Sequence, residues 1–489
     1  MKSACGLTIQ EAREGLDKGR FSAIELCKHY LAKIKAKNKE LNAFISLSEE
    51  EALKSARLAD QRIRNGTIKS ILDGIPIAIK DNICQKGQRT TAGSQILKNY
   101  IAPYDATVVR LLKEAGAVIL GKTNLDEFAM GSSTENSYFG PTRNPWDLSR
   151  VPGGSSGGSA VAVAADLCVA ALGSDTGGSI RQPASFCGVV GFKPTYGAVS
   201  RFGLIAMVSS FDQIGPLTKN VLDSAILLSF IAEKDHLDAT SVGLNWPKGE
   251  FLQIPKNPKR LRVGIIKENF ATGLDEKVKS LLLNTIELIK KAGLKVVEVS
   301  LPHLNYALAT YYVIMPAEVS SNLARYDGIR YGFSSLQKTP QKELSLEEVY
   351  NLNRAFGFGP EVKRRIMLGT YLLSAGYYEA FYKKAQKIRR LFTEDFLKAF
   401  NSVDFLLSPV APTVAFKLGE KTADPLLMYL SDIYTVPVNP AGLPAISLPC
   451  GFVDNLPVGL QIIGQHFEDY SLLQFSLFIE KLLKENDQK

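Results

Sequence analysis

Two loops rich in glycine and serine constrain the fold of this 489-residue chain more than any other feature. They cover residues 153–159, with the sequence GGSSGGS, and residues 173–179, with the sequence GSDTGGS. Clusters of this composition often act as flexible linkers. Here apolar segments flank both clusters closely, which indicates that the loops are embedded in a packed core.

The sequence around the loops predicts an α/β fold with a mixed sheet. Short β-rich runs, helices and glycine loops alternate from about residue 71 to residue 218. Because the chain exceeds the roughly 250–300 residues at which single cores stop growing, we expect additions to this body. We divide it into N-terminal helices packed on the core (1–65), a catalytic core (66–220) and the remaining α/β body (221–489). The last part includes a helical insertion at about 305–400 that contributes to the substrate pocket.

Local signals predict several individual elements. Thr8 with Glu11, and Ser22 with Glu25, have the spacing of capping boxes that begin helices. Other patterns predict a helix at 49–64, a β-α-β unit at 261–299, a strand at 405–407, a hairpin at 445–463 that turns at Asp454-Asn455, and a helix from Asp469.

Lys80 is a candidate catalytic base. It ends the apolar run 75–79, which reads as a buried strand, and Asp81 and Asn82 follow as turn residues. A serine nucleophile needs a neighbouring base, and the chain has only four histidines. Burial disfavours a charged lysine, so a buried Lys80 would supply a neutral amine near pH 7. The alternative is a strand-end lysine that extends its ammonium into water.

The second loop has the composition of an oxyanion hole. Its glycines allow several backbone N–H groups to point toward one position. We take the amides of Thr176, Gly177 and Gly178 as the candidate donors to a developing oxyanion. The first loop leads into an apolar helix, whose N-terminal amides would add positive potential near the serines.

These motifs resemble the signature of the amidase signature family. The matching stretches are DGIPIAIKDN at 73–82, the GGSSGGS loop, and GSDTGGSIRQPA at 173–184. The resemblance implies a Ser-Ser-Lys triad, with Ser179 as the nucleophile, Ser155 as the bridging serine after a cis peptide bond, and Lys80 as the base. It also implies the family's fold, a large mixed β-sheet covered by helices on both faces.

Further stretches resemble one branch of the family, the glutaminase subunits of tRNA-dependent amidotransferases. They lie at 115–137 and 439–451, while Ser431 and Pro440 depart from the residues expected there. This branch hydrolyses glutamine and supplies ammonia to a tRNA-binding subunit, which uses ATP to amidate Glu-tRNA(Gln) or Asp-tRNA(Asn). A small third subunit braces this heterotrimer. The sequence leaves open which charged tRNA is the acceptor.

The same resemblance suggests residues that would hold glutamine. A glutaminase must pair the α-carboxylate and the α-ammonium of its substrate, which requires a cation and an anion outside the glycine loops. The sequence does not distinguish Arg364 from Arg365, or Tyr311 from Tyr312, and a surface salt bridge remains an alternative for the arginines. The candidate substrate-binding residues are Gly131, Ser132, Tyr311, Tyr312, Arg364, Arg365 and Asp432.

Two other motifs match the sequence, but the elements predicted around them do not fit the sites that these motifs form. Residues 116–123 fit the phosphate-loop pattern, but a helix precedes Gly116 and the intervening residues are themselves a strand. Gly116 is better interpreted as a helix C-cap. Residues 153–157 fit the GxSxG elbow, but a polar loop precedes them and no histidine motif follows.

The dispersed charge and the cysteine spacing give no sign of a dedicated nucleic-acid site, a disulfide framework or a metal site. The net charge of +9 is dispersed, and we interpret the clusters at 33–39 and 383–390 as solvated helix faces. Six cysteines without paired spacing indicate reduced thiols of a cytoplasmic protein. We expect no metal site and no cofactor in this chain. Two other functions stay open, a free-standing amidase for small amides and an inactive scaffold that binds tRNA.

Overall fold

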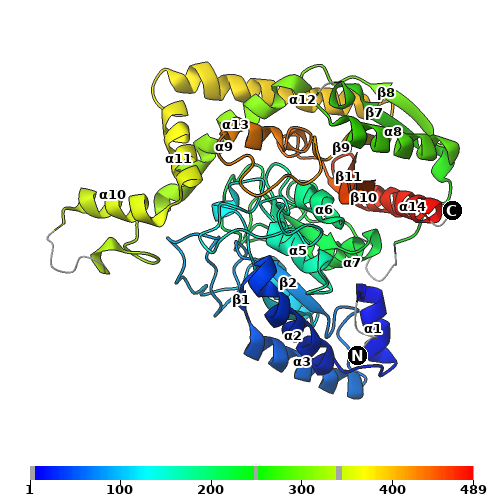
Figure 1. The fold of residues 1–489 in the computed structure, drawn as a ribbon, viewed down its shortest axis with the longest axis horizontal. Coiled ribbons are helices and arrows are strands. Elements are labelled where there is room, and N and C mark those ends of the chain that lie inside the picture. Colours follow the sequence, from blue (N-terminus) through cyan, green and yellow to red (C-terminus); the bar gives the residue numbers. More distant parts are fainter. Residues whose placement is uncertain (1–5, 247–251, 272, 338–343, 488–489) are drawn as a thin grey trace.

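The protein is built on one mixed β-sheet (Figure 1). Its structure, a computed structural model, describes residues 6–246, 252–271, 273–337 and 344–487. Within these residues eleven strands pair in the order β1-β3-β2-β4-β6-β5-β10-β11-β9-β7-β8. The strands are β1 (Phe44–Leu47), β2 (Pro76–Lys80), β3 (Val118–Thr123), β4 (Ala170–Asp175), β5 (Val190–Lys193), β6 (Gln213–Thr218), β7 (Arg262–Ile266), β8 (Lys295–Val299), β9 (Phe405–Pro409), β10 (Ala445–Val453) and β11 (Leu456–Ile463). The predicted α/β class with a mixed sheet is confirmed.

Helices pack on this sheet in several groups, of which two lie on its central and C-terminal strands. Helices α5 and α6 pack on the central strands and on each other, while α7, α14 and α8 form a second contiguous group that also contacts the sheet. The helices are α1 (Ile9–Asp17), α2 (Ala23–Leu41), α3 (Glu49–Arg64), α4 (Thr107–Glu114), α5 (Gly157–Ala164), α6 (Arg181–Cys187), α7 (Val221–Ile231), α8 (Glu276–Lys291), α9 (Ala307–Asn322), α10 (Leu346–Gly357), α11 (Pro360–Leu372), α12 (Lys383–Phe400), α13 (Pro425–Leu430) and α14 (Asp469–Asp487).

Strand direction places the two glycine-serine loops next to Lys80. Strands β3, β2 and β4 run parallel, with Ile79 of β2 opposite Leu172 of β4. Parallel neighbours end at the same edge of a sheet, so the residues after β4 lie beside the end of β2. Lys80 is the last residue of β2, and the loop at 173–179 begins within β4.

The elements predicted from local signals form as expected. Thr8 and Glu11, like Ser22 and Glu25, make reciprocal capping-box hydrogen bonds at the starts of α1 and α2. Strands β7 and β8 pair in parallel around α8, and β10 and β11 form the antiparallel hairpin. Asp454 and Asn455 turn this hairpin with positive φ angles of 50° and 62°. Turn residues that tolerate such angles made this position predictable.

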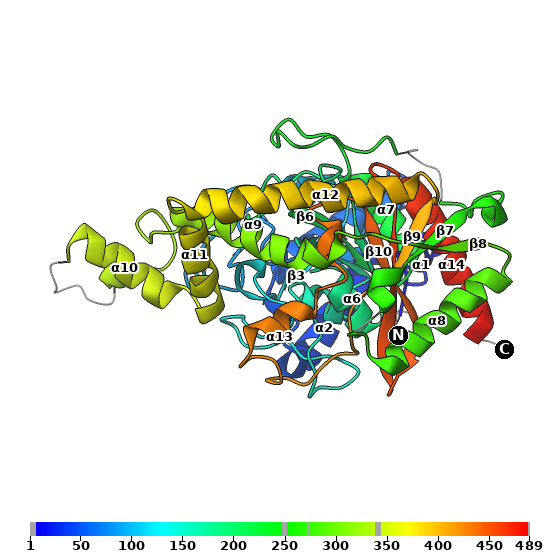
Figure 2. The ribbon, with the colours of Figure 1, turned by 90° about the horizontal axis from the view of Figure 1, so that it is seen from above.

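Helices α10 and α11 lie at one end of the molecule, and α9 and α12 extend from there toward the strands (Figure 1). Helix α9 packs against both α11 and α12. Figures 1 and 2 both show α10 reaching outward from the other elements, with α12 running alongside α9 toward the strands β7 and β8. This arrangement carries Tyr311 and Tyr312 of α9 back toward the sheet.

The phosphate-loop match lies in the core, as its context predicted. Gly116 ends the turn after α4 with a φ of 93°, and Lys122 is part of β3. Lys122 is buried, donates to Ile83 O at 2.6 Å and pairs with Asp81 at 3.1 Å. A lysine enclosed by these partners has no access to a nucleotide phosphate.

The basic cluster on α12 differs in one residue from a solvated helix face. Lys383, Lys384, Lys387 and Arg390 are exposed. The Arg389 side chain instead turns inward, donates from Nε to Pro440 O at 2.8 Å and lies over the Phe211 ring. Its guanidinium packs α12 onto the body, which a charge count along the helix did not reveal.

Candidate active site

Lys80 lies in a cage of serine oxygens. Its side chain is 0% exposed, and its Nζ lies 2.8 Å from Ser155 Oγ, 2.8 Å from Ser156 Oγ and 2.9 Å from Ser174 Oγ. These serines come from both glycine-serine loops. The geometry therefore joins the base predicted at the end of β2 to the bridging serine predicted in the first loop.

Burial makes Lys80 an effective proton acceptor. It lowers the pKa of the Lys80 amine to about 7, against the opposing attraction of Asp126, Asp175 and Asp212. A substantial share of the amine is therefore neutral at pH 7. An exposed strand-end lysine, the alternative from sequence, would remain protonated at this pH.

Ser155 lies on a backbone segment of unusual shape. The peptide bond between Gly154 and Ser155 is cis, as the family resemblance implied. A Cβ atom on Gly154 would lie 2.1 Å from Asp126 Oδ2 and 2.6 Å from Ser133 N, so only glycine fits there. The neighbouring amide of Ser156 donates to Ser179 O at 3.1 Å. This bond holds the two loops together.

Ser179, the candidate nucleophile, lies in the turn between β4 and α6. It is 8% exposed, and within the described residues its hydroxyl makes no hydrogen bond. The Asp175 carboxylate anchors the turn by accepting from Gly178 N at 2.7 Å and Ile180 N at 3.1 Å. A hydroxyl without a hydrogen-bond partner on a fixed turn is free to meet a substrate carbonyl.

A buried ion pair supports this turn. Asp175 pairs with Arg181 at 3.0 Å, and both side chains are 0% exposed. Arg181 also donates to Gln461 Oε1 and Asn439 Oδ1, which leaves no charge without partners. Burial alone would raise the pKa of Asp175, but the Arg181 guanidinium holds it well below its usual range.

The predicted oxyanion donors differ in availability. The N–H of Gly178 is already bonded to Asp175. Within the described residues, the N–H groups of Thr176 and Gly177 make no hydrogen bond. The Thr176 hydroxyl donates to Asp212 Oδ1 at 2.6 Å. The turn thus offers Thr176 and Gly177, rather than all three predicted amides, as free donors.

Asp432 and Ser132 meet beside this turn. Ser132 Oγ donates to Asp432 Oδ2. The other carboxylate oxygen, Oδ1, is buried and has no hydrogen-bond partner within the described residues. Burial raises the pKa of Asp432 to about 7, partly offset by the bond from Ser132. Such an unsatisfied acceptor is costly unless a ligand supplies a donor.

The two tyrosines line the same region in different ways. Tyr311 lies so close to Gly177 that a Cβ there would be 2.9 Å from its hydroxyl, and its ring stacks on Phe211. Tyr312 stacks on Tyr429, with ring centroids 4.0 Å apart. Tyr311 is therefore the tyrosine in direct contact with the nucleophile turn.

The structure separates the two arginines. The Arg365 side chain is buried, donates from Nε to Glu361 Oε1 at 2.8 Å and lies over the Tyr312 and Tyr429 rings. The Arg364 side chain is 48% exposed and pairs with Glu361 on the outer side of α11. Only Arg365 lies among the aromatic side chains near Asp432.

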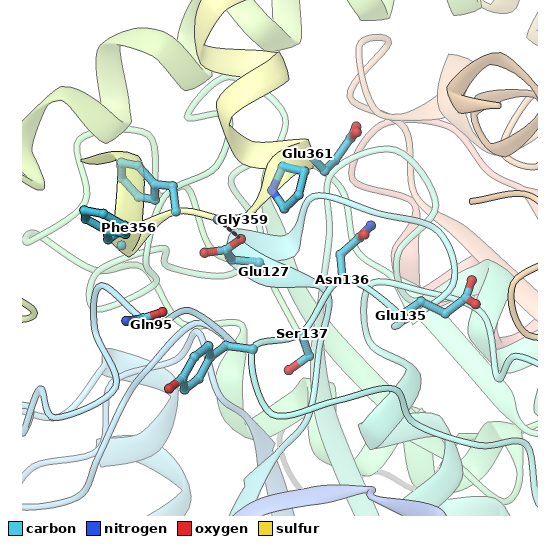
Figure 3. Close-up of a pocket in the computed structure, with 12 residues that line it drawn as sticks. Gln95, Glu127, Glu135, Asn136, Ser137, Phe356, Gly359 and Glu361 are labelled. Carbon is cyan, nitrogen blue, oxygen red and sulfur yellow. Dashed lines mark hydrogen bonds between the residues drawn. The ribbon is translucent and has the colours of Figure 1, made fainter. Parts of the chain in front are cut away.

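Glu127 fixes the start of α11 against the body. A cavity of about 290 Å³ lies between residues 135–138 and 356–361 (Figure 3). Glu127 lines it and accepts a hydrogen bond from Gly359 N at 2.8 Å, shown as a dashed line in Figure 3. This bond joins the helix that carries Arg365 to the segment that precedes Ser132.

Comparison with known proteins identifies the family of the chain. The family described as "Amidase" matches residues 25–473. The chain belongs to the amidase family. Its curated relatives include the glutamyl-tRNA(Gln) amidotransferase A subunit of Caldanaerobacter subterraneus, 56% identical over 98% of this chain and 96% of the relative. The corresponding protein of Coxiella burnetii is 54% identical over 96% of both chains.

Solved amidase structures share the whole fold. The A subunit of the glutamyl-tRNA(Gln) amidotransferase from Thermotoga maritima superimposes with a TM-score of 0.76 and 45% identity, covering 97% of this chain and 94% of that one. The peptide amidase of Stenotrophomonas maltophilia gives a TM-score of 0.80 and 31% identity over 98% and 97%. Family membership and the amidase fold are thus established for this chain.

Several residues of the site were not predicted from sequence. Ser156 and Ser174 bond Lys80 directly, and Asn82 donates to Ser174 Oγ at 2.9 Å. All three lie within the motifs that identified the triad, so their position in those motifs was an available signal. Asp126 lies in the quoted stretch at 115–137, whereas Asp212 lies outside the quoted motifs and reaches the site through tertiary contacts.

The described part of the chain lacks two other kinds of feature. No helix there is long and apolar enough to cross a membrane. No group of three or more His, Cys, Asp or Glu side chains among these residues is arranged to hold a metal ion.

Lys80 makes the stability of this amidase depend on pH in a defined direction. Its pKa is about 7 in the fold and 10.5 in an exposed lysine, so between these values the unfolded chain binds more protons. The free energy of unfolding therefore rises with pH across this window, by up to about 1.4 kcal/mol per pH unit. In urea denaturation between about pH 7 and pH 9, we expect Lys80→Met to lack this contribution.

A matched control is Lys277→Met, which removes an exposed lysine that pairs with Asp454. This variant should follow the pH dependence of the wild type. Parallel stability curves for the wild type and Lys80→Met would contradict a buried, largely neutral lysine.

Proposed function

We propose that this chain is the glutaminase subunit of a tRNA-dependent amidotransferase. The observation that carries the proposal is the buried Lys80 amine on Ser155 Oγ, beside the turn that presents Ser179. The curated relatives, which are A subunits of glutamyl-tRNA(Gln) amidotransferase, match over nearly their full lengths, and this supports the assignment to that branch of the family.

The reaction begins with attack on the side-chain amide of glutamine. Ser179 Oγ bonds to the amide carbon while its proton passes to Ser155, whose own proton passes to neutral Lys80. The carbonyl oxygen becomes an oxyanion that the amides of Thr176 and Gly177 stabilise. Protonated Lys80 then returns a proton, by way of Ser155, to the leaving nitrogen, and ammonia departs.

Hydrolysis completes the cycle. Water attacks the glutamyl ester on Ser179 and gives its proton to the same serine-lysine pair, which releases glutamate and regenerates the Ser179 hydroxyl. The ammonia serves a partner subunit that activates the charged tRNA with ATP, and a small third subunit completes the heterotrimer. Because the product enters translation, we place the chain in the cytoplasm.

Glutamine is selected by charges at the edge of the site. Asp432 Oδ1 lacks a donor within the described residues, and the α-ammonium of glutamine supplies one. Arg365 provides the cation for the α-carboxylate, with Ser132 and Tyr311 beside them. Gly131 packs against Asp126 and keeps the Ser132 segment close. Tyr312 supports Arg365 through its ring, and Arg364 lies outside this set.

A free-standing amidase for small amides is the second candidate function. The fold is shared with the peptide amidase of Stenotrophomonas maltophilia, so the triad alone does not choose between them. The unsatisfied oxygen of Asp432 favours a substrate with a cationic group, which simple amides lack.

Ser179→Ala should abolish glutamine hydrolysis while the chain stays folded, because the change removes the nucleophilic oxygen and little volume. Ammonia release by the purified amidotransferase complex measures this, and a serine-directed phosphonate should label the wild type but not the variant. Ser185→Ala is the control, since that buried serine contacts Gly459 on β11 instead of Lys80. Activity of Ser179→Ala within about tenfold of wild type, a barrier change of only ~1.4 kcal/mol, would refute the assignment.

Asp432→Asn should impair the use of glutamine far more than the use of glutaramate, which is glutamine without its α-amino group. The variant removes the charge that pairs with the ammonium and keeps the shape of the side chain. We expect kcat/KM for glutamine to fall roughly 100-fold, the loss typical of a buried charge-assisted bond, and kcat/KM for glutaramate to change little.

Arg365→Met and Arg364→Met extend the same test to the carboxylate. The first should reduce turnover of both substrates, since both carry that group, and the second should leave both unchanged. Equal losses of glutamine and glutaramate turnover in Asp432→Asn would instead favour the general amidase.

A further inference from the structure

Asp212 links two distant segments of the chain beside the nucleophile turn. It precedes β6 and is 3% exposed. Its Oδ2 accepts hydrogen bonds from Met207 N at 2.9 Å and Val208 N at 3.0 Å, while Oδ1 accepts from Thr176 Oγ1 at 2.6 Å. Two backbone amides thus fix the carboxylate that holds Thr176.

The turn that carries Ser179 is therefore held at both ends by carboxylates. Asp175 bonds the amides of Gly178 and Ile180 on the far side of the glycines. Asp212 bonds the side chain of Thr176 on the near side. The segment between these anchors contains the free amides of Thr176 and Gly177. Donors that are fixed before the reaction stabilise an oxyanion best, because they need no reorganisation.

We propose that Asp212 is a positioning residue for the acyl-transfer reaction, which acts by holding Thr176 and so orienting the amides that receive the oxyanion. This inference rests on the proposed function, because it concerns the rate at which the same site cleaves an amide. Asp212 itself touches neither substrate nor the reacting atoms.

Asp212 has a second, electrostatic effect on the site. Three carboxylates face Lys80 from different elements, Asp126 before the Ser132 segment, Asp175 at the end of β4, and Asp212 before β6. Each negative charge raises the pKa of the Lys80 amine against the effect of burial. Burial in turn raises the pKa of Asp212 to about 6, which hydrogen bonds from Thr176, Met207 and Val208 and the charge of Arg201 partly offset. Removing the Asp212 charge should therefore make Lys80 easier to deprotonate.

Two substitutions separate the effect of the hydrogen bond that holds Thr176 from the effect of the Asp212 charge. Thr176→Val removes the hydroxyl and leaves the Asp212 charge in place. Asp212→Asn removes the charge, yet its Oδ1 can still accept from Met207 and Val208 while its amide group donates to Thr176 Oγ1. Asp238→Asn is the control, because Asp238 lines the same cavity of about 220 Å³ as Asp212 but bonds Arg201 and Thr240 instead of the turn.

The experiment measures kcat and KM for glutamine against pH, and thermal unfolding, in the amidotransferase complex. Thr176→Val should lower kcat roughly 10- to 100-fold with KM nearly unchanged, because amides that are no longer held in place stabilise the oxyanion less well. Asp212→Asn should move the acid limb of the kcat profile to lower pH, and Asp238→Asn should match the wild type. A Thr176→Val variant with wild-type kcat would overturn the positioning role of Asp212, and an unshifted profile in Asp212→Asn would refute its electrostatic effect on Lys80.

A phosphonate probe keeps this test independent of the substrate assignment. Its reaction with Ser179 places the phosphoryl oxygen where the oxyanion forms, so the labelling rate reports the turn whatever amide the enzyme uses. Slow labelling of Thr176→Val supports the role of Asp212 even if the wild type fails to hydrolyse glutamine, a failure that would refute only the proposed function. Labelling of Thr176→Val at the wild-type rate would refute the positioning role.

Discussion

The site depends on one constraint, the placement of a lysine amine in the interior without a directly paired carboxylate. An isolated ammonium costs much free energy to bury. Burial therefore lowers the pKa of the lysine amine and favours its neutral form. Lys80 is buried in this way because β2 and β4 run parallel and end at the same edge of the sheet. Serine oxygens from the adjoining loops therefore surround its Nζ. Hydroxyl groups accept from the ammonium and also donate to the neutral amine, so the cage suits both protonation states.

The surrounding carboxylates hold the backbone more than they hold the lysine. Asp175 anchors the nucleophile turn and is neutralised by Arg181, while Asp126 accepts from the amides of Thr134 and Asn136 beneath the Ser132 segment. Acceptors of this kind let glycine-rich loops, which lose much entropy on folding, adopt one fixed shape. The second loop is therefore anchored within the core despite a composition typical of linkers.

Much of the fold, and the burial of Lys80 at the end of its strand, could be predicted because their signals are local. Capping boxes, the turn at Asp454-Asn455 and the strand that ends in Lys80 lie within a few residues of sequence. The sequence also contained a signal for which of Arg364 and Arg365 is buried. Val362, Gly369 and Leu372 repeat at helical spacing, and residue 365 falls on that buried face while residue 364 does not.

Other features had no local signal. The bond between Thr176 and Asp212 joins residues 36 positions apart, and Ser132 meets Asp432 across 300 positions. The hydrogen bond from Gly178 N to Asp175 depends on the geometry of the turn, which the residue types alone do not determine. Such contacts form only when the sheet order brings separate strands together.

The charge state of Lys80 is the central claim, and NMR titration of lysine labelled with ¹³C at Cε measures it directly, with the resonance assigned through Lys80→Met. We expect the Lys80 signal to titrate with a midpoint near pH 7. A signal that stays in the protonated position until about pH 10 or above, as for an ordinary exposed lysine, would contradict it.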